Sequence, residues 1–401
     1  MEDKLTRERG ILPQKQGARL LVLGILIVAS NLRAPLTSVG ALVPSIRDSL
    51  GASSAAVGII TTLPLLAFAL ISPFAPKVAE RHGMERTIFL SMLLLFIGIA
   101  LRSVTGVATL FIGTALIGIA ISFGNVLLPG FIKLSFPYQV GIITSFYTVF
   151  MNVFGAIASG ISVPLSGVGG LGWQGALAAW GLLTLLAMII WLPQLKKSDS
   201  NTDQGPAIKT ETKMWKSSIA WQVTIFMGLQ SLMFYTPVTW LPNILQSSGY
   251  SSAEAGWLLS LMQIAVVLTT FVIPIVADRL NNQKLLGVMT GVLFIISILG
   301  LLSGQQTIII ISVILLGAGC GSGFSLAMML FTLRTKNGHE ASKLSGMAQS
   351  AGYSLAAFGP VLFGGLYDMT GNWVLPLCML LLASSILAIA GYLSGRKVTI
   401  K

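Results

Sequence analysis

The sequence predicts an all-α membrane protein of twelve transmembrane helices, arranged as two six-helix bundles. Hydrophobic residues make up 54% of its 401 residues and charged residues only 9%, whereas about a quarter of a soluble domain is charged. Apolar runs of about twenty residues, the length that crosses the hydrocarbon core of a bilayer, recur along the whole chain. This composition excludes a soluble enzyme. No cofactor or metal site is expected, because Cys320 and Cys378 lie in apolar runs without nearby His.

The expected helices form two groups of six, separated by a polar segment near the middle of the chain. The first group is expected at 20–46, 55–75, 87–101, 108–134, 140–163 and 173–192. The second group is expected at 219–245, 253–277, 284–302, 307–333, 344–367 and 373–393. The polar segment has no apolar period, which is typical of a flexible connector. We therefore expect an N-terminal bundle over residues 1–195, a cytoplasmic linker over 196–217 and a C-terminal bundle over 218–401.

The positions of the basic residues support this helix count. With the N-terminus in the cytoplasm, all but three of the 25 Lys and Arg residues fall at the cytoplasmic ends of the predicted helices, as the positive-inside rule requires. Arg47 and Arg102 fall on the outer side, and Arg33 falls within the first helix. We therefore expect a multi-pass protein of the inner membrane with both termini in the cytoplasm. The same distribution accounts for the net charge of +12 without a nucleic-acid partner.

An internal repeat relates the two groups of helices. The segment Pro76-Lys77-Val78-Ala79-Glu80-Arg81 follows the second helix, and Pro274-Ile275-Val276-Ala277-Asp278-Arg279 follows the eighth in the same frame. The same offset joins Pro44 to Pro242. Because an offset of six helices preserves the direction of each helix, the bundles are expected to be parallel repeats about a pseudo-two-fold axis along the membrane normal. That geometry predicts a cavity between them.

Twelve helices, a central linker and paired acid-Arg loops resemble the major facilitator superfamily. In that family the loop between helices two and three follows G-x-x-x-D-R-x-G-R-R, and Pro76, Glu80, Arg81, Gly83 and Arg86 occupy the matching frame here. Pro replaces the first Gly and Glu replaces the Asp. The resemblance implies a small-molecule transporter in the lipid bilayer that works by alternating access, as a monomer, and not an enzyme.

Two segments resemble one family within the superfamily. Residues 31–40, Asn-Leu-Arg-Ala-Pro-Leu-Thr-Ser-Val-Gly, are similar to helix one of the cyanate permease and nitroimidazole transporter family. Residues 228–231 with 234–235 and 240–242 are similar to its helix seven. The resemblance implies a small anionic, nitro-type or cyanate-like polar solute as substrate.

Arg33 is the principal candidate for binding such a solute. It lies about thirteen residues from each end of its predicted helix, hence roughly 20 Å along the axis and near the bilayer middle. An arginine at that depth costs at least about 3 kcal/mol, so it is expected to face a wet cavity and meet an anion or other acceptors. Its planar guanidinium matches carboxylate-like or nitro-like oxygens. The alternative is an arginine held by helix carbonyls or an Asn to shape the bundle.

Further polar and aromatic side chains at depth complete the predicted substrate site. They are Asn31, Asn125, Tyr147, Asn152, Gln230, Tyr235, Gln263, Gln349 and Tyr353. Each polar one has an alternative role as a hydrogen-bonding contact between helices. The resemblance also implies that charged loop residues latch the bundles in one state, namely Glu80, Arg81, Arg86, Asp278 and Arg279. Their alternative is that they are ordinary solvated loop ends.

The acidic residues leave the expected interior without a negative charge. All 13 Asp and Glu residues lie in loops or at helix ends, so no buried proton relay is visible and a net positive cavity is expected to favour anions. An exporter of polar drugs or metabolites is the alternative within transport. A channel is the alternative outside carrier transport, although no ring of charged or carbonyl-lining segments is present.

Overall fold

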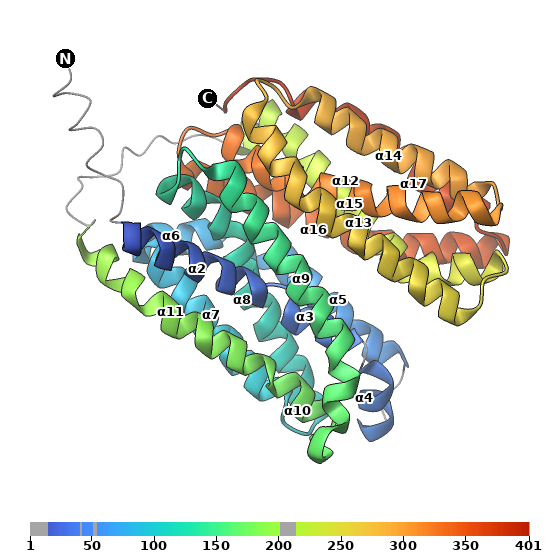
Figure 1. The fold of residues 1–401 in the computed structure, drawn as a ribbon, viewed down its shortest axis with the longest axis horizontal. Coiled ribbons are helices and arrows are strands. Elements are labelled where there is room, and N and C mark those ends of the chain that lie inside the picture. The colour runs from blue at the N-terminus through green and yellow to red at the C-terminus, as the bar shows by residue number, and fades with distance from the viewer. Residues whose placement is uncertain (1–14, 41, 51–53, 201–213, 401) are drawn as a thin grey trace.

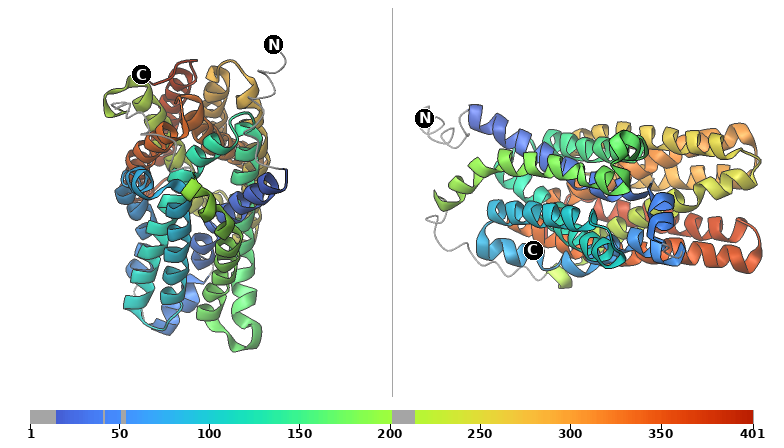
Figure 2. Two further views of the ribbon diagram at one scale, coloured as in Figure 1. Left: turned by 90° about the vertical axis from the view of Figure 1, so that its left-hand side faces the viewer. Right: turned by 90° about the horizontal axis from the view of Figure 1, so that it is seen from below.

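A computed structural model describes residues 15–40, 42–50, 54–200 and 214–400, and these residues form helices joined by short loops without any strand. Two bundles of roughly parallel and antiparallel helices lie side by side (Figure 1). The first bundle, from α2 to α11, is the N-half, and the second, from α12 to α17, is the C-half. Figure 2 shows the long helices of both halves running along a common direction.

The described part of the N-half contains ten α-helices. They are α2 (Lys15–Asn31), α3 (Ala34–Gly40), α4 (Val43–Leu50), α5 (Ser54–Ile71), α6 (Ala75–His82), α7 (Met84–Arg102), α8 (Val107–Ser135), α9 (Val140–Gly167), α10 (Gly172–Ala178) and α11 (Trp180–Ser200). A short 3-10 turn, η2 (Val168–Gly170), follows α9.

The C-half consists of six long helices preceded by a 3-10 turn, η3 (Met214–Lys216). The long helices are α12 (Ser218–Ser247), α13 (Ser252–Arg279), α14 (Lys284–Leu302), α15 (Gln306–Leu333), α16 (Gly338–Thr370) and α17 (Val374–Ser394).

The described helices account for the twelve predicted spans. Nine spans in the described part are long and apolar enough to cross a membrane, and the bent pair Thr62–Ile71 and Ala75–His82 makes a tenth. The other two expected spans are α12 and α16, which are long but carry many Ser, Thr and Gln residues. Neighbouring helices can form hydrogen bonds with such side chains. Helices that line a bundle interior can therefore be more polar than helices that face lipid.

Three predicted helices differ from the observed ones. The first predicted helix, 20–46, is broken into α2, α3 and α4, and the second bends by 57° between α5 and α6. The sixth is divided into α10 and α11. Proline contributes to the break between α2 and α3 and to the bend between α5 and α6, because Pro35 and Pro73 lack the N–H that a continuous helix would use.

The two halves repeat the same helix pairing. In the N-half the first span (α2 and α3) packs on α9, α5 packs on α8, and α7 packs on α11. In the C-half the equivalent pairs are α12 with α16, α13 with α15, and α14 with α17. Between the halves, α9 contacts α13, and α16 contacts α5 and α8. This pairing agrees with two parallel repeats facing each other.

The molecule has two distinct ends along its helices. The end that holds α6, the end of α11 and the C-terminal residues is called the linker end (Figure 1). The opposite end, which holds α4 and α10, is called the far end. Charged loop residues discussed below lie at the linker end, where α8, α13 and α15 finish and α9 and α16 begin.

Candidate functional site

Arg33 lies at the break in the first span. α2 ends at Asn31 and α3 begins at Ala34, so Arg33 belongs to neither helix. Its carbonyl accepts hydrogen bonds from the N–H groups of Leu36 and Thr37 at 3.0 and 3.1 Å, which starts α3 immediately after the break. Pro35 prevents the regular helical bond across this point. Discontinuous helices of this kind expose backbone and side-chain polar groups at transporter binding sites.

The guanidinium of Arg33 contacts both halves of the molecule. Its Nη1 donates to Asn152 Oδ1 of α9 at 3.2 Å, and Asn152 Nδ2 donates to the Thr148 carbonyl at 2.8 Å, which fixes the amide. From the C-half, the Phe234 ring lies 4.6 Å from Arg33 Cζ in a cation–π contact. The stem of Arg33 packs on Gly155, where an added Cβ would lie 2.9 Å from Arg33 Cγ.

No carboxylate in the described chain forms an ion pair with Arg33, and its side chain is partly exposed. One of its nitrogens is used by Asn152, and the Phe234 contact uses the ring face rather than an acceptor atom. The guanidinium therefore keeps donors that can bind an oxygen-rich group.

Aromatic side chains from both halves extend from Phe234. The Phe234 and Tyr235 rings are 5.2 Å apart, and Tyr235 is 6.3 Å from Tyr353 of α16. Tyr353 in turn lies 5.1 Å from Phe68 of α5, in the N-half. Tyr147, Tyr235 and Tyr353 are all close enough to Arg33 to interact electrostatically with it. These residues form an aromatic cluster beside the guanidinium.

Asn125 and Gln349 connect the halves beside this cluster. Gln349 Nε2 donates to the Asn125 carbonyl at 3.0 Å and to Ser345 Oγ at 2.8 Å. Gln349 Oε1 and Asn125 Oδ1 are buried without a hydrogen-bond partner among the described residues, as is the Tyr147 hydroxyl. Buried groups of this kind are free to bind water or a polar solute.

No hydrogen bond among the described residues joins the other predicted polar residues to Arg33, and Gln263 Oε1 is likewise buried without a partner there. Asn31 is fully buried between α2 and α11, where Thr184 Oγ1 donates to Asn31 Oδ1 at 2.7 Å and Asn31 Nδ2 contacts the Leu183 carbonyl at 3.3 Å. Gln230 donates to its neighbour Ser231 Oγ at 2.8 Å. Gln263 is partly buried on α13 and contacts neither Arg33 nor Asn152 through a hydrogen bond. Asn31 therefore has the helix-packing role given above as the alternative.

Two contacts with Arg33 were missed from the sequence. The sequence indicates Phe234 only as part of a family segment, and it does not indicate Gly155 as a contact. An aromatic residue beside Tyr235, in the helix that the repeat pairs with the helix of Arg33, was the available signal for Phe234. Gly155 gave no such signal, because chain spacing does not show which glycine of α9 faces the first span.

Charged side chains join the halves at the linker end. Lys343 Nζ of α16 forms an ion pair with Glu80 Oε1 of α6 at 2.7 Å. Asp278 Oδ2, at the end of α13, accepts the Gly141 N–H at 3.2 Å, at the start of α9. A carboxylate at a helix N-terminus interacts favourably with the helix dipole. Of the predicted latch residues, Glu80 and Asp278 thus contact the opposite half.

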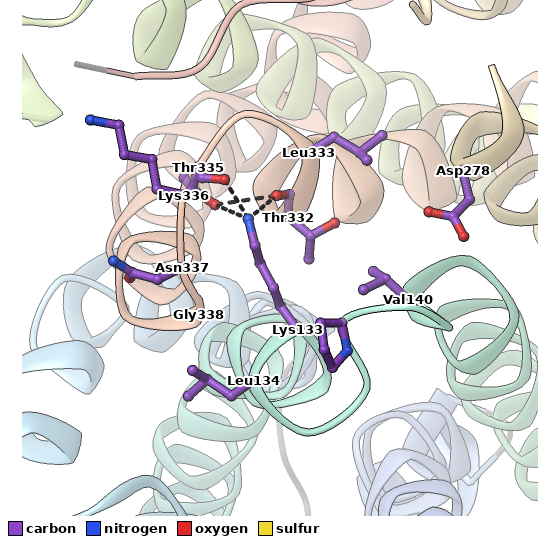
Figure 3. A pocket seen from close by; sticks show the side chains of 11 residues that line it. Lys133, Leu134, Val140, Asp278, Thr332, Leu333, Thr335, Lys336, Asn337 and Gly338 are labelled. Carbon is purple, nitrogen blue, oxygen red and sulfur yellow. Dashed lines mark hydrogen bonds between the residues drawn. The ribbon is translucent and has the colours of Figure 1, made fainter. Parts of the chain in front are cut away.

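The remaining predicted latch residues, Arg81, Arg86 and Arg279, are exposed. Lys133, which the prediction omitted, makes the most extensive contact of this kind. Its ammonium donates to the carbonyls of Thr332 and Thr335 and to Thr335 Oγ1 at 3.2 Å, across the interface (Figure 3). These groups border a cavity of about 450 Å³ that is lined by both halves.

Removing the latch carboxylates is expected to lower transport without unfolding the protein. The side chains of Lys343 and Glu80 are 37% and 42% exposed. Glu80→Ala should therefore lower the free energy of unfolding by no more than about 1 kcal/mol. Asp278→Ala should lower transport more than Glu80→Ala does, because it also removes a charge from a helix N-terminus. Initial uptake rates in vesicles, compared with the amount of folded protein, test this. Unchanged rates in both variants would contradict a latch.

Two bundles with the same helix pairing, apolar spans and a charged residue at a broken helix define a helical membrane transporter. A family model described as Major Facilitator Superfamily matches residues 21–360 and, in a second match, 228–399. The chain therefore belongs to the major facilitator superfamily, and its fold is the twelve-helix fold of that superfamily. Its members are transporters and not enzymes, which confirms both expectations drawn from the sequence.

Curated relatives place the chain within the superfamily. It is 46% identical over 377 residues to the uncharacterized transporter YycB of Bacillus subtilis. The matched region covers 94% of this chain and 93% of the relative. It is 42% identical over 383 residues to the 2-nitroimidazole transporter of Escherichia coli, covering 95% and 97%. The cyanate transport protein CynX of Escherichia coli is more distant, at 23% over 356 residues, covering 88% and 92%. These relatives confirm the family resemblance.

Solved structures support the fold alone. The proton:xylose symporter XylE matches with a TM-score of 0.73 over 96% of this chain and 97% of its own, at 14% sequence identity. At that identity the match carries no information on substrate.

Proposed function

We propose that this transporter carries a small anionic, nitro-type or cyanate-like solute by alternating access around Arg33. One observation carries the proposal: the guanidinium has no carboxylate partner among the described residues, and it contacts Asn152 of one half and Phe234 of the other. A solute bound there touches both halves, so their relative movement would change the side from which it is reached. The names of the relatives that transport 2-nitroimidazole and cyanate support this solute class.

The neighbours of Arg33 favour a planar solute. A nitro or carboxylate group presents two oxygens in a plane, which match the donor fork of a guanidinium. A flat ring attached to that group would lie against Phe234, Tyr235 and Tyr353, whose rings already pack edge to face. The site therefore favours a flat, electron-rich solute over a bulky cation.

The linker end is proposed to be the cytoplasmic end, with both termini in the cytoplasm and the bundles separated by the 196–217 linker. In this arrangement the protein is a monomer in the cell membrane and closed toward the cytoplasm. The contacts of Lys133, Asp278 and Glu80 across the interface support this state. Opening toward the cytoplasm requires that all three contacts break.

Counterflow in liposomes tests the proposal. Purified protein is reconstituted, the liposomes are preloaded with unlabelled 2-nitroimidazole, and entry of labelled 2-nitroimidazole is followed; cyanate is tested in parallel. A carrier gives transient accumulation above the outside concentration, because the excess of unlabelled solute inside competes with the label for exit. Equal entry with and without preloading would indicate a channel. No entry of either solute would overturn the proposed substrate class.

A further inference from the structure

Arg102 is a buried charge with an unusual environment. Its position at the end of the third predicted helix suggested an outer-loop residue, but its side chain is 0% exposed in the last turn of α7. Its Nη1 donates to the Pro35 carbonyl of α3 at 2.8 Å. Its Nε and Nη2 are buried without a partner among the described residues. The sequence predicts only that Arg102 falls on the outer side, and its burial there was not expected.

The cost of burying Arg102 is high compared with that of the other buried arginine. Arg334 donates from Nε to the Ser394 carbonyl at 2.7 Å, from Nη1 to the Leu333 carbonyl and from Nη2 to Gln283 Oε1, so all three of its nitrogens have partners. Within the described part of the chain, Arg102 has one partner for the same charge. An uncompensated buried charge costs several kcal/mol. A purely structural requirement would be met better by an apolar side chain of the same size.

The single bond of Arg102 ends on the short helix that follows Arg33. Pro35 is the second residue of α3, which spans only Ala34–Gly40. On its other side α3 is held by Thr37 Oγ1, which donates to the Gly155 carbonyl of α9 at 2.7 Å. The break before Ala34 removes the continuous helical bonding that would otherwise tie α3 to α2. The Arg102 side chain of α7 and the Gly155 carbonyl of α9 therefore hold α3 in place.

We infer that Arg102 is a positioning residue that holds α3 and thereby sets the direction in which Arg33 presents its guanidinium. Gly113 of α8 allows this placement, because an added Cβ there would lie 2.5 Å from the Arg102 backbone nitrogen. The close approach holds the end of α7 against α8, and from there the Arg102 side chain reaches the Pro35 carbonyl of α3. The effect on α3 does not depend on the solute, whereas the effect on transport rests on the proposed function of Arg33.

The mobility of α3 gives a direct test in the full-length protein. A nitroxide is attached at Gly40→Cys in a background with Cys320→Ser and Cys378→Ser, and its spectrum is compared between native Arg102, Arg102→Met and Arg102→Lys. Gly40 has no atom within 4 Å of an added Cβ, so the label does not disturb packing. A label at Gly160→Cys on α9, which also has open space, is the matched control in the same half.

Arg102→Met is expected to increase label mobility at position 40 but not at 160, and to leave the melting temperature unchanged or raised because a buried charge is removed. Arg102→Lys, which keeps a donor, should restore part of the order. Affinity for 2-nitroimidazole should fall on the order of tenfold in Arg102→Met. If native protein binds neither 2-nitroimidazole nor cyanate, the proposed function fails, and the label still tests the role of Arg102.

Three results would overturn the inference. The first is an unchanged spectrum at position 40 in Arg102→Met. The second is an equal rise in mobility at both labelled positions, which would indicate general loosening of the N-half. The third is a lowered melting temperature that accounts for any loss of binding, which would show that Arg102 acts on stability alone.

Discussion

Arg33→Gln is expected to weaken binding of 2-nitroimidazole or cyanate by roughly 10- to 100-fold, because a hydrogen bond to a charged group contributes about 1.5–3 kcal/mol. Glutamine keeps one donor, so the folded protein loses charge but not all polarity at the break between α2 and α3. The cation–π contact with Phe234 would also be lost. Transport rate should fall with affinity.

Isothermal binding and counterflow on the same preparations measure this effect. Arg19→Gln is the matched control, since it makes the same chemical change in the same span at an exposed position. Arg33→Lys should bind more weakly than native protein but better than Arg33→Gln, because an ammonium keeps the charge without the planar fork. Equal affinities in native and Arg33→Gln protein would overturn the role of Arg33 in binding.

The fold could be predicted in some detail because it depends on signals local in the sequence. Apolar runs, the positive-inside pattern and the repeated Pro76 and Pro274 segments each indicate spans and their direction without knowledge of tertiary contacts. The breaks were missed although their causes, Pro35 and Pro73, were visible. A proline inside a span can bend it, break it or leave it intact, and neighbouring helices decide which.

The candidate site was less predictable because it depends on which helix faces turn toward each other. Arg33 was identifiable because a charge at that depth is costly. Asn31 and Asn152 looked equivalent in the sequence, yet only Asn152 bonds to Arg33, while Asn31 faces α11. The position of Arg102 at a helix end predicts its side of the membrane but not that tertiary packing buries its side chain. At the linker end the acids were predicted, whereas their partners Lys343 and the Gly141 N–H were not.

Close approaches of backbone between the halves also escaped prediction. An added Cβ at Gly338, the first residue of α16, would lie 2.3 Å from the Gly130 carbonyl oxygen of α8. One at Gly141 of α9 would lie 2.8 Å from the Pro274 carbonyl oxygen of α13. For the described glycines of the far-end parts of α9, α13 and α16, none of the nearest neighbours of an added Cβ comes from the other half. Glycine thus permits the halves to meet at the linker end.

Gly338→Ala is therefore expected to open the linker end. The methyl group cannot fit against the Gly130 carbonyl while the halves are closed there, and overpacking of this kind costs about 1–3 kcal/mol. That energy changes the ratio of two conformations by roughly 5- to 150-fold in favour of the state in which α8 and α16 separate. Alanine also favours helix over glycine by up to about 1 kcal/mol, equally in both states, so folding should not suffer.

Distances between spin labels on the two halves check this expectation. Labels at Tyr138→Cys and His339→Cys, both exposed at the linker end, should show a longer distance in a larger fraction of Gly338→Ala molecules than of native ones. Labels at Thr105→Cys and Asn372→Cys at the far end should move closer together. Gly365→Ala is the control in the same helix, because its added Cβ meets no atom within 4 Å. Identical distance distributions in Gly338→Ala and native protein would show that the contact between Gly130 and Gly338 does not limit opening.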